Sequence, residues 1–129
     1  MARQAKKDEE KDFQTVTNEH AKRSIESMRE ELADEEQRER ISEGALEVSV
    51  RGGWHSPGDK QGSKPIEYYI LLGTGGPAAR IIGELSEYGE PENVRFQYQD
   101  WFKPWTDAHL SDEDENTLLE YAHQFYFGE

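Results

Sequence analysis

The sequence has no cysteine among its 129 residues. Disulfides, zinc sites built on cysteine and cysteine nucleophiles are therefore excluded. Long hydrophobic runs are also missing: the longest apolar-rich run, Tyr68 to Leu72, is far too short to span a bilayer. The N-terminal residues 1–12 lack the apolar segment of a secretory signal. These absences are compatible with a protein of the reducing cytoplasm.

Basic residues are scarce, with 15 Lys and Arg against 28 Asp and Glu, and the formal net charge is −13. Residues 1–43 hold nine bases and thirteen acids, and residues 44–129 hold six bases and fifteen acids. Direct binding to nucleic acid needs a basic face, and anionic membranes repel an acidic one. We therefore expect that the chain binds neither nucleic acid nor membranes. The negative charge predicts a basic protein surface as its partner.

Aromatic residues are unevenly distributed. All three Trp, all six Tyr and four of the five Phe lie in residues 44–129. We therefore expect a disordered charged tail over residues 1–14, an N-terminal helix over 15–43 and an α+β core domain over 44–129.

The N-terminal helix is predicted from the absence of Pro and Gly in residues 15–41. Its few apolar residues recur at helical spacing and form one narrow stripe. The stripe consists of Ala21, Ile25, Met28 and Leu32. Two alternatives are open: the stripe rests on the core of the same chain, or it packs on a partner or on a second copy. Gly44 is the expected end of the helix.

Four strands are predicted after Gly44 from alternation, β-branched residues and turn signals. They cover residues 46–51, 66–72, 78–85 and 94–99. Short links favour an antiparallel meander, with Val48, Val50, Ile81 and Phe96 on its inner face. A C-terminal helix is expected over residues 112–127. The predicted fold is α+β: a four-stranded antiparallel sheet with the N-terminal and C-terminal helices packed on one face.

Motifs for catalysis are weak. Residues 73–77 (GTGGP) lack the Lys and Ser or Thr of a phosphate loop and predict a hairpin turn. His55, Asp59, Asp107 and His109 could in principle meet around a metal ion, but no HExxH spacing accompanies them. No Gly-x-Ser-x-Gly is present either. We therefore predict a binding protein without cofactor or metal, and keep a metal enzyme using these four residues as the alternative.

Two features are candidates for partner binding. The segment 100–106 (DWFKPWT) holds three large aromatics within five residues; it either caps the core or forms a contact platform, since Trp is enriched in interface hot spots. The acids after it either solvate a helix start or join those near residue 90 in one continuous negative face. The candidate residues are Glu84, Glu87, Glu90, Glu92, Asp100, Trp101, Trp105, Asp107, Asp112, Glu113 and Asp114.

The stretch from Gly44 to Gly128 resembles small acidic proteins of unknown function encoded by bacteriophages and prophages. The resemblance is carried by residues 49–58 (SVRGGWHSPG), 70–78 (ILLGTGGPA), 100–106 and 121–128. Such proteins are similar in type to anti-CRISPR and anti-restriction inhibitors, which often imitate DNA. The resemblance implies an accessory protein, in the cytoplasm of a bacterial host, that binds and inhibits a defence or nucleic-acid-handling complex. The alternative is an assembly or homodimerisation module that uses the N-terminal helix.

Overall fold

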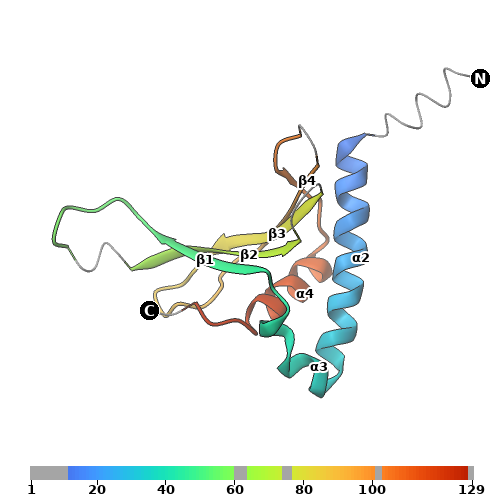
Figure 1. Ribbon diagram of the computed structural model, residues 1–129, viewed down its shortest axis with the longest axis horizontal. Coiled ribbons are helices and arrows are strands. Elements are labelled where there is room, and N and C mark those ends of the chain that lie inside the picture. The colour runs from blue at the N-terminus through green and yellow to red at the C-terminus, as the bar shows by residue number, and fades with distance from the viewer. Residues whose placement is uncertain (1–11, 60–63, 74–76, 101–102, 128–129) are drawn as a thin grey trace, which may run out of the picture.

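The computed structural model describes residues 12–59, 64–73, 77–100 and 103–127, which form a sheet with helices on one of its faces (Figure 1). The elements in chain order are α2 (Phe13–Ala33), α3 (Glu35–Glu39), the 3-10 turn η1 (Ile41–Glu43), β1 (Glu47–Gly52), β2 (Pro65–Gly73), β3 (Ala78–Glu84), β4 (Arg95–Gln99), β5 (Thr106–Asp107) and α4 (Asp112–Ala122). The α+β class and the antiparallel sheet agree with the prediction.

The sheet has five strands in the order β1-β2-β3-β4-β5, and every neighbouring pair is antiparallel. The prediction of four strands is wrong because β5 was missed. This strand is only two residues long, with Tyr98 opposite Thr106 and Gln97 opposite Asp107. Two residues cannot show an alternating pattern, so the sequence carries no signal for such a strand.

The N-terminal helix is interrupted near its end. α2 begins at Phe13, where the Asp12 carboxylate accepts a hydrogen bond from the Gln14 amide. It stops at Ala33 because Asp34 adopts an extended conformation and its carboxylate accepts from the Glu36 amide at 3.0 Å, starting α3. The single helix expected up to residue 43 is therefore one 21-residue helix followed by two short elements, and Gly44 ends the last of them.

The apolar stripe of α2 belongs to the core of the same chain. All four stripe residues are buried and share one cluster with the inner side of the sheet and with α4. Ile81 and Phe96 are fully buried, as predicted, whereas Val48 and Val50 are not. These two valines lie opposite buried residues of β2 but on an edge strand that no helix covers, and they are 38% and 42% exposed.

The C-terminal helix is shorter than expected, because α4 ends at Ala122 and an irregular segment follows. This segment still contributes to the core: the Phe127 ring lies 4.7 Å from the Tyr68 ring. Two aromatic residues after the helix, Phe125 and Phe127, thus belong to the same buried cluster as Tyr68 of β2.

The backbone just before β4 passes close to β3 on the inner face of the sheet, which is the face that the helices cover. The Tyr68 hydroxyl donates to the Asn93 carbonyl at 2.7 Å, and the Asn93 side-chain oxygen accepts from the Glu84 amide at 2.8 Å. Asn93 crosses directly over Gly83, where a Cβ atom would collide with the Asn93 carbonyl and the Tyr68 ring. Only glycine leaves room for this crossing.

We predict that Gly83→Ala lowers the free energy of unfolding by about 1–3 kcal/mol, because the added methyl group forces Asn93 and Tyr68 apart. The matched control is Gly73→Ala, since nothing lies within 4 Å of a Cβ atom at Gly73. Urea denaturation followed by circular dichroism measures both. Equal unfolding free energies for the two variants would contradict this account of the crossing.

A second prediction concerns His20, which stacks on Tyr98 with ring centroids 4.2 Å apart. Burial, and then the nearby Arg23, lower the pKa of His20 below its ordinary value of 6.5. The folded state thus prefers the neutral imidazole, and the stability present above pH 6.5 falls as the pH drops through the folded-state pKa. Nuclear magnetic resonance titration of His20 checks the direction. His20→Gln should lose less stability than wild type between pH 7 and pH 5; an unchanged loss would refute the linkage.

Candidate protein-binding surface

The structure distributes the candidate residues over three places. Four of the acids lie at the end of β3 and in the turn that leads to β4; they are Glu84, Glu87, Glu90 and Glu92. A second group, Asp100, Trp105 and Asp107, lies after β4 and on β5. The third, Asp112 to Asp114, opens α4 beside α2, whereas the β3–β4 turn lies at the far end of the sheet (Figure 1). Trp101 lies outside the described residues.

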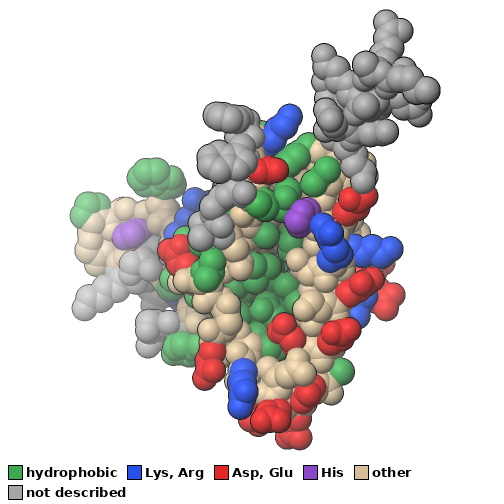
Figure 2. Space-filling model, turned by 45° about the vertical axis from the view of Figure 1, so that its right-hand side comes forward, with side chains coloured by type: hydrophobic (Ala, Val, Ile, Leu, Met, Phe, Trp, Pro, Cys, Tyr) green, Lys and Arg blue, Asp and Glu red, His purple; other side chains and the backbone are tan. Residues whose placement is uncertain are grey.

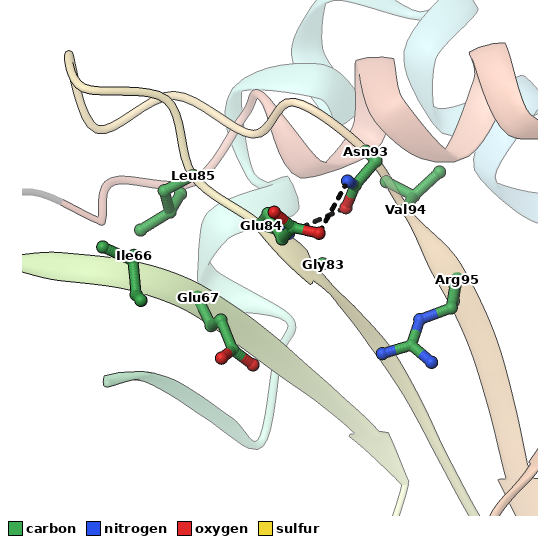
Figure 3. Close-up of a pocket in the computed structure, with 8 residues that line it drawn as sticks. All are labelled: Ile66, Glu67, Gly83, Glu84, Leu85, Asn93, Val94 and Arg95. Atoms are coloured by element: carbon green, nitrogen blue, oxygen red, sulfur yellow. Dashed lines mark hydrogen bonds between the residues drawn. The ribbon is translucent and has the colours of Figure 1, made fainter. Parts of the chain in front are cut away.

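The β3–β4 turn borders a shallow hollow of about 680 Å³ (Figure 3). Glu84 is held there by Asn93, whose side-chain nitrogen donates to its carboxylate at 3.4 Å. The hollow contains both signs of charge, since Glu67 and Arg95 also line it. Glu87, Glu90 and Glu92 are exposed and lie apart from the α4 acids, so the two groups do not adjoin as they would in the alternative of one continuous negative face.

The second group is occupied by contacts within the chain. The Arg80 guanidinium lies 4.0 Å from the centre of the Trp105 ring and donates to the Gln97 side chain at 2.8 Å. Gln97 in turn donates to Asp107 at 2.7 Å, and Arg95 lies 3.6 Å from the same carboxylate. Trp105 therefore packs on the sheet face away from the helices and is not a member of the buried core cluster, which differs from the alternative in which this segment caps the core.

The open face of the sheet is nearly neutral. The strands contain seven charged residues, and the strand register places all of them on the face away from the helices. They are Glu47, Arg51, Glu67, Arg80, Glu84, Arg95 and Asp107. Arg51 and Glu67 form an ion pair of 2.8 Å. Four acids and three bases, with ion pairs of Arg51 with Glu67 and of Arg95 with Asp107, do not make an acidic docking face.

The helices, in contrast, concentrate negative charge. Residues 26–43 and 112–120 together hold thirteen acids and three arginines, a balance of −10 within 27 residues. Two ion pairs hold the segments side by side: Arg29 with Asp114 at 2.8 Å and Arg38 with Glu120 at 3.3 Å. We call these two segments the acidic helical surface. Figure 2 shows acidic side chains outnumbering basic ones along the lower part of this side of the molecule.

Several carboxylates of the acidic helical surface are available to a partner. Glu26, Glu30, Glu35 and Glu39 are exposed and form no ion pair within the described part of the chain. Three α4 acids were among the residues predicted to bind a partner, but these four helix residues were not. The apolar stripe of α2 was the signal that could have identified them. A helix that packs this stripe on the core lies beside α4 on the same face of the sheet, so its exposed acids lie near those of α4.

The candidate metal ligands do not gather. Asp107 is engaged by Gln97 and Arg95, and His55 lies in the β1–β2 loop with its Nδ1 atom 3.0 Å from the Gly53 carbonyl. The His109 backbone amide donates to Asn18 on α2. Within residues 12–59, 64–73, 77–100 and 103–127, no group of three or more His, Cys, Asp or Glu is placed to hold a metal ion.

Comparison of the chain with protein-family models, with curated proteins and with solved structures gave no match. Among the described residues, none of the helices combines the length and the apolar character needed to cross a membrane.

We predict that Trp105 and Arg80 are energetically coupled, because the guanidinium stacks on the indole at a partly exposed site. A double-mutant cycle with Arg80→Met and Trp105→Leu should give a coupling free energy of about 0.5–1 kcal/mol in urea denaturation. Strictly additive effects would mean that this contact does not hold Trp105 in place, and would return it to the candidates for partner binding.

Proposed function

We propose that this chain is a binding protein, not an enzyme, and that its acidic helical surface docks on a basic surface of another protein. The observation that carries the proposal is the balance of −10 gathered in residues 26–43 and 112–120, which ion pairs through Arg29 and Arg38 hold together. Exposed carboxylates on rigid helices attract a cationic surface over several ångströms and speed association with it.

The partner that we propose is a host defence or nucleic-acid-handling complex. Such complexes hold phosphates with clustered Lys and Arg, and a carboxylate-rich helical face offers these residues the same charge as a nucleic-acid backbone. A chain seated there would compete with DNA and thereby inhibit the complex. The resemblance of residues 49–58, 70–78, 100–106 and 121–128 to phage and prophage proteins supports an accessory role in a phage or mobile element, and the bacterial cytoplasm as its location.

The test begins with the chain immobilised and exposed to bacterial lysate at low salt, followed by elution with salt and then with duplex DNA. We expect a basic nucleic-acid-binding complex that DNA displaces. The variant Glu26→Gln/Glu30→Gln/Glu35→Gln should then bind the purified complex about tenfold more weakly, mainly through slower association, because it loses three unpaired charges of the docking surface.

The matched control is Glu87→Gln/Glu90→Gln/Glu92→Gln, which removes the same number of exposed carboxylates from the β3–β4 turn. Surface plasmon resonance at two salt concentrations compares the three proteins. Equal weakening by both variants would indicate a response to net charge alone and would refute the acidic helical surface. A complete lack of salt-eluted partners would refute the proposed function itself.

A further inference from the structure

β1 (Glu47–Gly52) forms one edge of the sheet. Among the described residues β2 is its only neighbour in the sheet, and five of the six β1 residues are exposed. The opposite edge, β5, is only two residues long. Proteins usually protect an edge strand with proline, lysine or a covering loop, because its unpaired N–H and C=O groups accept another strand. β1 contains neither proline nor lysine; its charged residues, Glu47 and Arg51, and a register shift after Arg51 lie toward its ends, and residues 48–50 between them carry no such protection.

The unpaired backbone groups of β1 can be identified. The Leu85 amide donates to the Ile66 carbonyl at 2.8 Å, which fixes which residues of β2 bond to β3. In an antiparallel sheet, alternate residues of a strand hydrogen-bond to opposite neighbours. Ile66 and every second residue after it therefore bond to β3, whereas the residues between them bond to β1. Their partners on β1 are Glu47, Ser49 and Arg51. Val48 and Val50 therefore turn their N–H and C=O groups toward the free edge.

The side chains of β1 match a second copy of the same strand. In an antiparallel pair about a twofold axis at Ser49, Glu47 lies opposite Arg51 of the other copy, and Val48 opposite Val50. This register also pairs the residues whose backbone groups face the edge. A shift by one pair would place Glu47 or Arg51 opposite serine and lose both charge matches. The sequence Glu-Val-Ser-Val-Arg is thus complementary to itself in the register that the backbone permits.

The valine side of β1 adds an apolar contribution. Val48 and Val50 share the sheet face of the buried Ile70 and Tyr68 and are 38% and 42% exposed. Leu46 and Ile66, beside them, are 58% and 47% exposed. Figure 1 shows the β1–β2 hairpin extending beyond the helices, so neither helix shields this row from water. Pairing two copies would place the rows next to each other across the axis and bury part of this surface.

We propose that two copies of the chain associate through their β1 strands into a twofold symmetric dimer with one continuous ten-stranded sheet. The occupant of the edge is a second copy because the charges of β1 are self-complementary and balanced, whereas the rest of the molecule is acidic. Arg51 remains able to pair with its own Glu67, now 2.8 Å away, since a guanidinium carries five donors. The interface is isologous, so association stops at two copies.

The experiment uses the full chain and two charge variants, Glu47→Arg and Arg51→Glu, in analytical ultracentrifugation, with circular dichroism to confirm that each is folded. The wild type should dimerise in a concentration-dependent way. Each variant alone places like charges opposite each other at both ends of the interface and should weaken dimerisation at least about tenfold. An equimolar mixture restores both opposite-charge pairs, so the variants should form a heterodimer with near wild-type affinity.

Val50→Pro provides an independent test, because it removes an N–H group that faces the edge without removing a hydrogen bond to β2, and proline is tolerated on edge strands. We expect a folded monomer. Three results would overturn the proposal: a wild type that stays monomeric up to about 1 mM, the weak end of specific association; charge variants that dimerise like wild type; or a mixture of the two variants that forms no heterodimer.

Discussion

The structure depends on the packing of α2 against the inner face of the sheet. α4 has only 11 residues and reaches part of that face, whereas α2 has 21 residues and extends about 30 Å. Ile25 and Met28 belong to the same buried cluster as Phe96 and Tyr98, and Phe13 lies 5.6 Å from the Tyr98 ring. Without α2 these aromatic residues of β4 would face water. Composition alone separates α2 from the aromatic-rich part of the chain, yet α2 is one of the two helices that cover the core of that part.

The same packing explains where the charge gathers. Both helices lie on one face, so their solvent sides form one outer surface, and any acids on them come together however distant they are in sequence. Arg29 forms an ion pair with Asp114, and Arg38 forms one with Glu120. These pairs are partly exposed, and each stabilises the fold only modestly. Their larger effect is to hold two acidic segments in register, so that the carboxylates left unpaired act as a group.

Local patterns in the sequence predicted the elements but not their limits or their neighbours. Alternation, β-branched residues and turn signals located four strands, and helical spacing identified the stripe on α2, because each of these signals extends over several residues. β5 is too short to repeat, and the break at Asp34 depends on a single carboxylate that caps the next helix. One alternative joined the acids near residue 90 with those of α4 in a single negative face, but the meander carries these two groups to different ends of the molecule. That separation is a property of the topology, which no local pattern contains.

Val48 and Val50 also show that a local pattern does not contain the positions of neighbouring elements. Their alternation with polar residues is typical of a half-buried strand, and it indicates correctly which side of the strand is apolar. It does not indicate whether the chain itself supplies the cover. The sheet is five strands wide, and α2 and α4 cover its middle and its β4 side, so the apolar side of β1 remains partly exposed. An apolar row on an unprotected edge is costly for a soluble monomer. A strand whose charges complement themselves resolves this conflict most simply by pairing with its own copy, which explains why valines are present at an edge where polar residues would otherwise suffice.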